Sequence, residues 1–269
     1  MGVKDAPFFL MILNKDLRIE IVKMISKAGE GHLPSSFSIL DIINFVYTNV
    51  IRFKKNKLNW LKRDYFILSK GHGCAALYVV LNKFGILKKK DIYNYGNRRG
   101  ILGGHPDATT VPGVEASTGS LGHGFPTAIG LALGLKIQKK KNKIIILIGD
   151  GECHEGTIWE SANIANNLDL GNVCAIVDWN GSAAQLMPKD DLLNKWKAFG
   201  WKTFVVDGHS NKDLRKTFKK IKFNLNGTPS VILAKTIKGK GVSFLEGHGN
   251  WHHKIPNKEE KIKIFEELV

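Results

Sequence analysis

The 269-residue sequence has few cysteines and no long apolar run, and these absences exclude several classes of protein. Its three cysteines, Cys74, Cys153 and Cys174, are an odd number without metal-ligand spacing, so we expect reduced thiols and no disulfide framework. No apolar run approaches the roughly 20 residues of a membrane span, and Phe8–Leu13 is too short for a secretory signal. Ala6 replaces the Ser or Thr of a myristoylation signal. We therefore expect a cytoplasmic protein that is not held in a membrane.

Acidic residues are also scarce, since 24 Asp and Glu stand against 40 Lys and Arg, which gives a formal net charge of +16. The surplus lies in short, separated lysine runs at 54–57, 88–90, 139–143, 219–222 and 258–263. None of these runs carries the interleaved aromatic side chains of a single-strand binding surface. We therefore expect a solvated lysine surface and no nucleic-acid partner. A basic nucleic-acid-binding module stays an alternative, which binding that collapses with salt would reveal.

Repeats, low-complexity segments and a linker rich in Pro, Gly or Ser are all absent, so one domain over residues 1–269 is the simplest interpretation. The first third of the chain is mainly helical in pattern. Apolar residues recur at helical spacing between Phe9 and Ile25, and a second apolar helix, Ile39–Val50, follows three serines that can cap it, Ser35, Ser36 and Ser38.

Short apolar β runs alternate with helical stretches through the rest of the chain. The runs are Tyr65–Leu68, Ile144–Ile148, Val173–Val177, Phe204–Val206 and Val231–Leu233, and the later helical stretches are Ile158–Asn167, Leu192–Phe199 and Leu214–Ile221. Starts about 30 residues apart are typical of successive βαβ units. This pattern predicts an α/β fold with a parallel sheet and helices on both faces. Ligands of such folds bind outside the carboxyl ends of the strands.

The strongest chemical motif stands directly after one of these runs, at Gly149-Asp150-Gly151-Glu152. Glycines let the backbone approach a diphosphate at the start of the following helix. Asn180 follows the next run, 30 residues after Asp150 and one βαβ crossover away, so both side chains reach the same edge of the sheet. Carboxylate and amide oxygens are hard ligands suited to a divalent ion such as Mg²⁺. The spacing predicts a metal and diphosphate site.

The residues around this motif resemble the thiamine-diphosphate-binding signature of transketolases. The likeness covers essentially the whole chain, in blocks that follow the family's order: GEGHLPSSFSILDI, RDYFILSKGHGCAALY, GGHPD, PGVEASTGSLGHG, GDGECHEGTIWESANIANNLDLGNVCAIVDWNG, FGW with VDGH, and AKTIKGKGVSF. The resemblance implies the thiamine-diphosphate-binding fold. It further implies the diphosphate-binding, N-terminal subunit of a split transketolase, whose C-terminal half is a separate polypeptide.

Several site residues follow from the resemblance alone. Asp150 and Asn180 would hold Mg²⁺, or Ca²⁺ or Mn²⁺, with the backbone carbonyl of Ser182 as third ligand. Glu155 would join a proton network with a glutamate across the dimer interface. The residues expected to contact thiamine diphosphate are His72, Gly119, Leu121, Gly149, Asp150, Gly151, Glu152 and Asn180.

Four histidines match those that line the substrate channel of the family: His32, His72, His105 and His252. Transketolases transfer a two-carbon ketol unit from a ketose to an aldose, and each step moves a proton on or off a sugar oxygen. Thiamine diphosphate supplies the carbanion, and imidazoles, which change charge between about pH 5 and 8, suit the proton transfers. We expect these histidines and Glu155 to be the catalytic set.

Two segments depart from the family pattern, and both lie near the expected sugar. Leu33-Pro34-Ser35-Ser36 stands where Pro-Gly-Gly-Ser is usual, and residues 181–188 replace a short Asp-Gly turn. A transketolase step in a specialised sugar pathway, on a sugar or sugar phosphate, is therefore a hypothesis.

The resemblance also implies that the domain that binds the cofactor's aminopyrimidine is expected outside this sequence. We therefore expect a C-terminal partner subunit with a pyrimidine-binding domain, assembled as an α2β2 heterotetramer. The alternative enzyme is the α subunit of a thiamine-dependent 2-oxoacid dehydrogenase, which shares the Gly-Asp-Gly to Asn motif but is not expected to carry the four histidines.

Overall fold

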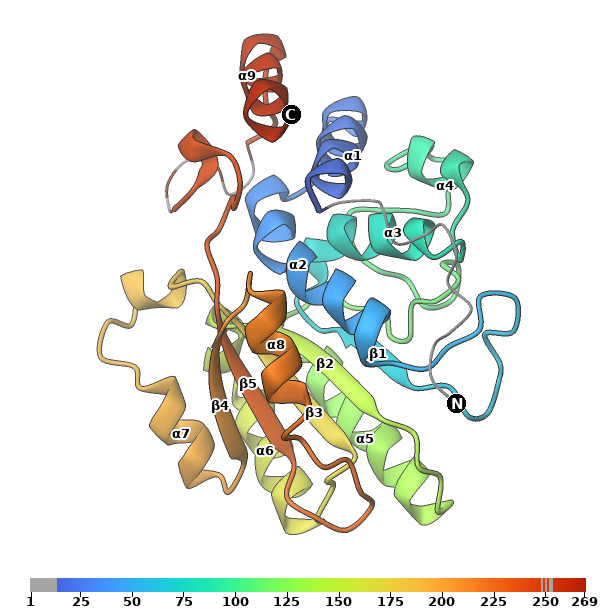
Figure 1. The fold of residues 1–269 in the computed structure, drawn as a ribbon, viewed down its shortest axis with the longest axis vertical. Coiled ribbons are helices and arrows are strands. Elements are labelled where there is room, and N and C mark those ends of the chain that lie inside the picture. Colours follow the sequence, from blue (N-terminus) through green and yellow to red (C-terminus); the bar gives the residue numbers. More distant parts are fainter. Residues whose placement is uncertain (1–13, 248, 250, 252–253) are drawn as a thin grey trace.

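The computed structural model describes residues 14–247, 249, 251 and 254–269, which form a parallel sheet between two layers of helices (Figure 1). The strands are β1 (Tyr65–Leu68), β2 (Ile144–Gly149), β3 (Val173–Trp179), β4 (Lys202–Asp207) and β5 (Ser230–Lys235). Their order is β1-β2-β3-β5-β4, and every neighbouring pair is parallel. The predicted α/β class, the parallel sheet and all five strand positions are confirmed.

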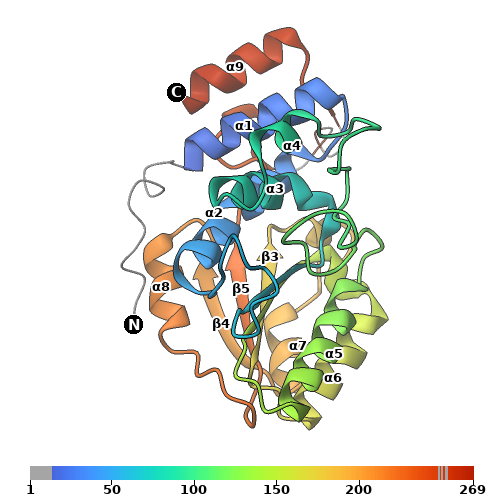
Figure 2. The ribbon, with the colours of Figure 1, turned by 90° about the vertical axis from the view of Figure 1, so that its right-hand side faces the viewer.

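Helices cover both faces of the sheet, as the sequence pattern predicts (Figure 2). One face is covered by α2 (Leu33–Asn49) and α8 (Asn211–Phe218), with α1 (Asn14–Ala28), α3 (Cys74–Lys83), α4 (Lys89–Tyr93) and α9 (Lys258–Leu268) beyond them. The other is covered by α5 (Gly124–Ile137), α6 (Gly156–Asn167) and α7 (Leu192–Ala198). The described residues also include four 3-10 turns: η2 (Gly71–Gly73), η3 (Gly151–His154), η4 (Ala183–Gln185) and η5 (Ser243–Leu245).

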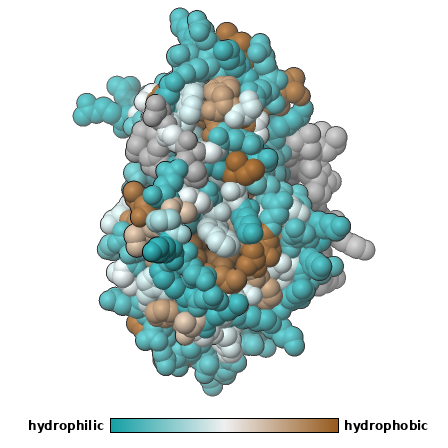
Figure 3. All heavy atoms as spheres, turned by 90° about the vertical axis from the view of Figure 1, so that its left-hand side faces the viewer, coloured by the Kyte–Doolittle hydropathy of each residue, from teal (hydrophilic) through white to brown (hydrophobic). Residues whose placement is uncertain are grey.

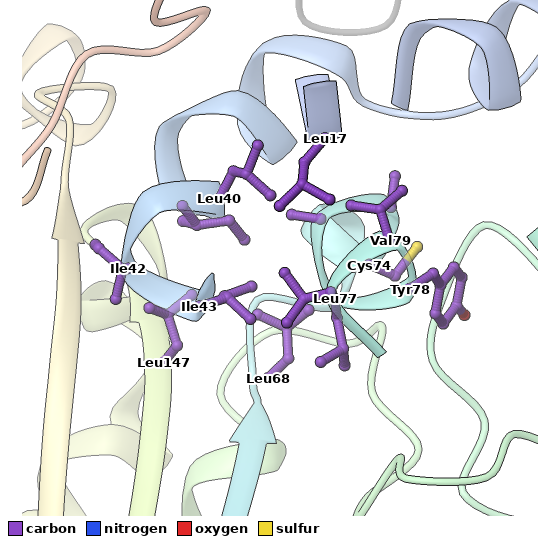
Figure 4. Close-up of a cluster of buried hydrophobic side chains, with 14 of the residues drawn as sticks. Leu17, Leu40, Ile42, Ile43, Leu68, Cys74, Leu77, Tyr78, Val79 and Leu147 are labelled. Carbon is purple, nitrogen blue, oxygen red and sulfur yellow. The ribbon is translucent and has the colours of Figure 1, made fainter. Parts of the chain in front are cut away.

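The central strands are apolar on both sides because each side packs on a helical layer. In β2, Ile145 and Leu147 belong to the core under α1, α2 and α3, whereas Ile144, Ile146 and Ile148 belong to the core under α5 and α6. This period-2 division is what a strand buried on both faces requires. Figure 4 shows the first core, where leucine and isoleucine side chains of the helices meet those of β1 and β2.

The start of α2 differs from the sequence expectation. The helix begins at Leu33 rather than after the serines, and its N-cap, His32, makes no side-chain capping hydrogen bond. Pro34 occupies the first turn, where its fixed φ and missing N–H are tolerated. The capping role predicted for Ser35, Ser36 and Ser38 is therefore wrong: the three serines are buried inside the helix. Residues 9–13 of the predicted first helix lie outside the described residues.

Within the described part of the chain, no helix is both long enough and apolar enough to cross a bilayer. The three cysteines are buried free thiols, and burial raises the pKa of Cys74 to about 12.

Candidate active site

Asp150 stands at the carboxyl end of β2, where the backbone turns into η3. Its side chain is 3% exposed. Oδ1 accepts a hydrogen bond from the backbone N–H of Gly151 at 2.8 Å, and Oδ2 accepts a longer one from the N–H of Ala183 at 3.4 Å. Burial, followed by the negative charge of Asp178, raises the pKa of Asp150 above its ordinary value. The carboxylate is thus held in place without full compensation of its charge.

Asn180 follows β3 and lies at the same edge of the sheet. Its Nδ2 donates to Asp178 Oδ2 at 2.9 Å, and its Oδ1 accepts from the backbone N–H of Ser182 at 3.0 Å. Ser182 is the N-cap of η4, whose first residue, Ala183, contacts Asp150. The short turn 180–183 therefore connects the three predicted metal ligands.

Asp178 is a site residue that the sequence analysis missed. It is fully buried and accepts hydrogen bonds from four separate segments: Ser38 Oγ of α2 at 2.8 Å, Lys70 Nζ after β1 at 2.5 Å, Asn180 after β3, and Thr236 Oγ1 after β5. Burial raises the pKa of Asp178, but the charge of Lys70 and the hydrogen bonds outweigh it, so the pKa lies below its ordinary value. Asp178 thus ties together the segments that border Asp150.

Two lysines place positive charge beside these carboxylates. Lys70 is 2% exposed and pairs with Asp178. Lys238, in the loop after β5, is half-buried, and burial followed by the charge of Lys70 lowers its pKa, while Asp150 and Asp178 act in the opposite direction. Both lysines therefore lie within electrostatic reach of Asp150. The sequence signal that points to them is a position in the segment that follows a β run, after Tyr65–Leu68 for Lys70 and after Val231–Leu233 for Lys238.

Three of the four predicted histidines come together from distant parts of the sequence. His32 lies at the N-cap of α2, His72 in η2 after β1, and His105 in the loop between α4 and α5. The rings of His32 and His72 are 5.2 Å apart between centroids, and those of His32 and His105 are 6.4 Å apart. His252 lies outside the described residues. His32, His72 and His105 thus form one imidazole cluster around His32.

The segment 117–122 packs between this cluster and the start of α6. A Cβ atom on Gly119 would lie 3.3 Å from the His105 ring, so the glycine permits a close approach. Gly122 has φ +82°, and a Cβ there would lie 2.5 Å from Thr157 Oγ1. Leu121, between them, is partly exposed. Gly119 therefore adjoins the His105 ring, and Gly122 adjoins the start of α6.

Glu152 is buried, at 1% exposure, and binds the backbone of the surrounding loops. Oε1 accepts from Ser69 Oγ and from the N–H of Gly122 at 2.9 Å, and Oε2 accepts from the N–H of Gly149 at 3.1 Å. Burial raises the pKa of its carboxyl despite these hydrogen bonds. The structure thus gives Glu152 a role in joining the ends of β1 and β2 with the 117–122 loop.

Glu155 is the N-cap of α6, and its side chain is exposed. An exposed carboxylate at this position is accessible to another chain.

The donor atoms fit a hard divalent cation. Asp150 supplies carboxylate oxygens, Asn180 an amide oxygen, and the 180–183 turn backbone carbonyls, and Mg²⁺ in proteins is held by one or two carboxylates together with waters and phosphate oxygens. No group of three or more His, Cys, Asp or Glu side chains suited to a metal occurs among the described residues.

Comparison with known proteins identifies the family. The model of the transketolase thiamine diphosphate binding domain matches residues 12–268. The chain belongs to the transketolase family. It is 37% identical over 257 residues to one subunit of the apulose-4-phosphate transketolase of Phocaeicola vulgatus, covering 94% of this chain and 89% of that protein. It is 38% identical over 229 residues to the SqwG subunit of the 6-deoxy-6-sulfo-D-fructose transketolase of a Clostridium species, covering 83% and 82%.

Longer transketolases match this chain with only part of their length. Human transketolase is 34% identical over 261 residues, which are 94% of this chain but 41% of the human protein. The structure of Campylobacter jejuni transketolase superimposes with a TM-score of 0.86 at 27% identity, covering 95% of this chain and 42% of that one. The chain thus spans about two fifths of the solved transketolase chains. The predicted resemblance and the thiamine-diphosphate-binding fold are confirmed.

Proposed function

We propose that residues 1–269 act as one diphosphate-binding domain, the N-terminal subunit of a two-chain transketolase. The observation that carries the proposal is the placement of three imidazoles and the Asp150–Asn180 pair along one edge of a transketolase-family sheet. The reaction would transfer a two-carbon ketol unit from a ketose to an aldose.

Asp150, Asn180 and the backbone carbonyl of Ser182 would hold Mg²⁺, and that ion would bind the diphosphate of thiamine diphosphate. The cofactor, when bound, supplies the electron sink for cleavage of the C–C bond. Lys70 and Lys238 would place positive charge on the diphosphate side, and the lack of a Cβ at Gly149 and Gly151 would leave the backbone open to close approach. Glu152 would act on this site by positioning its loops.

The imidazoles would handle the protons. His32, His72 and His105 present ring nitrogens within one cluster, so a sugar hydroxyl or carbonyl among them could exchange a proton with any of the three. His252 keeps the same proposed role. Gly119 and Leu121 would line the cofactor pocket, and the lack of a side chain at Gly119 lets His105 pack closely against it.

A partner subunit would complete the site. The exposed Glu155 would meet a carboxylate of another chain, and exposed apolar side chains stand in the loop after Asn180, with Leu186 86% and Met187 51% exposed. Apolar side chains on a site-bordering loop favour a surface that another protein covers. Figure 3, viewed from the side of edge strand β4, shows brown apolar patches within a mainly hydrophilic surface. A C-terminal transketolase subunit, in an α2β2 assembly, is the proposed partner, and a cytoplasmic location stays a prediction.

The substrate would be a ketose or ketose phosphate of a specialised pathway. The relatives named for apulose-4-phosphate and 6-deoxy-6-sulfo-D-fructose support such a substrate, as do the departures at Leu33-Pro34-Ser35-Ser36 and residues 181–188.

The test is reconstitution with a chain that resembles a transketolase C-terminal half. The two chains, thiamine diphosphate and Mg²⁺ are incubated with a panel of ketose donors and aldose acceptors, and products are followed by mass spectrometry. We expect two-carbon transfer by the pair and none by either chain alone. Full turnover by this chain alone would contradict the two-chain proposal. Turnover of 2-oxoacids but not ketoses would instead identify a 2-oxoacid dehydrogenase α subunit, which the imidazole cluster disfavours.

A further inference from the structure

The segment Thr236–Lys240, here called the β5 loop, crosses the carboxyl edge of the sheet and carries Lys238. It is held at several points by parts of the chain that are far away in sequence. Thr236 Oγ1 donates to Asp178, the N–H of Gly239 donates to the carbonyl of Pro34 at 3.0 Å, and Arg18 Nε donates to the carbonyl of Lys240 at 2.8 Å. The backbone on both sides of Lys238 is therefore held in place by hydrogen bonds.

The fourth attachment is His209, in the loop after β4. Its Nε2 accepts a hydrogen bond from the backbone N–H of Ile237 at 2.9 Å, directly beside Lys238. Its Nδ1 lies 2.6 Å from Asp41 Oδ2. The His209 and Asp41 side chains are 12% and 7% exposed, so neither contact is a loose surface interaction.

The partners determine which nitrogen of His209 carries the proton. The Ile237 N–H can only donate, so Nε2 must be unprotonated, and an ionised Asp41 can only accept, so Nδ1 must carry the proton. Asp41 is kept ionised by its surroundings: Arg18 Nη2 lies 2.7 Å from Oδ2 and Asn14 Nδ2 lies 2.5 Å from Oδ1. Arg18, Asp41 and His209 thus form a chain of buried hydrogen bonds, here called the His209 relay, that ends at the backbone of Ile237 in the β5 loop.

We propose that His209 is a positioning residue for the diphosphate end of the cofactor site: held by Asp41, which pairs with Arg18, it fixes the backbone of Ile237 and so directs Lys238 toward Asp150. The proposal rests on the function proposed above, since the diphosphate is what Lys238 would contact. His209 itself touches neither the metal ligands nor the imidazole cluster in any contact described for it. No catalytic role was predicted for His209 from the sequence.

A purely structural role of His209 makes a different prediction. If the residue only stabilised the fold, any substitution would act on stability, and its effect on ligand affinity would not depend on Lys238. If it acts through Lys238, the two substitutions must be non-additive.

The experiment is a titration of magnesium pyrophosphate into the full chain by isothermal calorimetry. We expect His209→Ala to weaken binding about tenfold, the effect of losing roughly one good hydrogen bond. His209→Gln, which can still present an oxygen to the Ile237 N–H, should retain most of the affinity. His209→Asn, which can reach Asp41 but not Ile237, should lose it. On a Lys238→Met background, His209→Ala should add almost nothing. Thermal unfolding of each variant checks that the chain is folded.

Three results would overturn the proposal: unchanged affinity in His209→Ala, equal loss in the Gln and Asn variants, or the same tenfold loss with Met at position 238. If His209→Ala does not fold, the Gln and Asn pair decides. Failure of the native chain to bind magnesium pyrophosphate would overturn the proposed site and this role together. Binding that is lost in Asp150→Asn but unaffected by His209→Ala would overturn this role alone.

Discussion

Buried carboxylates lie at both edges of the sheet, but Asp64 at the amino edge and Asp150 at the carboxyl edge differ in how far their charge is paired. At the amino edge, Asp64 before β1 accepts from Arg52 Nη2 at 2.8 Å, from Arg52 Nε at 3.0 Å, and from the backbone N–H groups of Arg52 and Lys143, both at 2.8 Å. At the carboxyl edge, Asp150 is held by two backbone N–H groups, one of them 3.4 Å away, beside a second carboxylate. At the amino edge, the charge of Asp64 is therefore paired with Arg52 of the same chain. At the carboxyl edge, the N–H groups that hold Asp150 are uncharged, so its negative charge is available to a bound cation.

The largest effect is expected from Asp150→Asn, which should lower ligand affinity without lowering stability. Asp150→Asn should weaken magnesium pyrophosphate binding at least about 100-fold, because it removes a charged metal ligand. The same change should leave the free energy of unfolding of the metal-free chain unchanged or higher, because burial already disfavours the charged carboxylate. Calorimetry and urea unfolding measure the two quantities. A strong loss of stability in the metal-free Asp150→Asn variant would show that the charge of Asp150 is already compensated within the chain, as that of Asp64 is.

Asp178→Asn should affect both quantities, because Asp178 pairs with buried Lys70 and also orients Asn180. We expect a loss of about 3 kcal/mol in the free energy of unfolding from the unpaired buried cation. Affinity for magnesium pyrophosphate should fall roughly 10- to 100-fold. Adding Lys70→Met should restore much of the stability but not the affinity; restoration of both would show that Asp178 has no role in orienting the site.

Asp64→Asn is the matched change at the amino edge. It should lower the free energy of unfolding by about 2 kcal/mol, because hydrogen-bond donors of Arg52 and Lys143 lose their charged acceptor. Magnesium pyrophosphate affinity of the folded variant should equal that of the native chain. A change in affinity would mean that the two edges are coupled.

Ionisation of Asp41 should make the stability of the chain depend on pH, because its carboxylate holds His209 beside the β5 loop. Burial raises the pKa of Asp41, but His209 and Arg18 together lower it below its ordinary value of 3.8. Its contribution to stability is therefore present above pH 3.8 and is lost as the pH falls through the lower folded-state pKa. Urea unfolding of the native chain and Asp41→Asn should show a stability difference that shrinks below pH 3.8. A pH-independent difference would exclude ionised Asp41 as its source.

Ser38→Ala should have the smallest effect. It removes one of the four groups that donate to Asp178, so we expect a loss of about 1 kcal/mol in the free energy of unfolding and a reduction of a few fold in affinity. Ser36→Ala, in the same helix and also buried, is the control for loss of a buried hydroxyl. Equal effects of the two changes on affinity would argue against a role for the Ser38 contact.

The sequence predicted the strands because burial on both faces leaves a plain pattern. Ile144–Ile148 and Val173–Val177 are uninterrupted apolar runs, and both are strands in the structure. The start of α2 was not predicted because Pro34 and the serines are compatible with either a cap or a first turn. The choice depends on tertiary contacts such as that of Ser38 with Asp178, 140 residues away.

The candidate site was predictable where a motif is contiguous. Gly149-Asp150-Gly151 and Asn180 could be placed at one edge from their spacing alone, and the His32–His72–His105 cluster came from family resemblance. Asp178, Lys70 and His209 were missed because their importance arises from pairings across 108 and 168 residues, which a single sequence does not display.

The strand order also has a consequence for the order of assembly. Since β5 lies between β3 and β4, β4 has no hydrogen-bonded strand beside it until residues 230–235 have been synthesised. Domains generally form as units during synthesis, with long-range pairings late. The β5 loop follows directly after β5, which is the last strand in the described sequence. The nascent chain therefore completes the five-stranded sheet and adds Lys238 at nearly the same point of synthesis. A ribosome-bound chain that ends before Ser230 would hold the Asp150 turn but neither the attachment of His209 to the loop nor a paired β4.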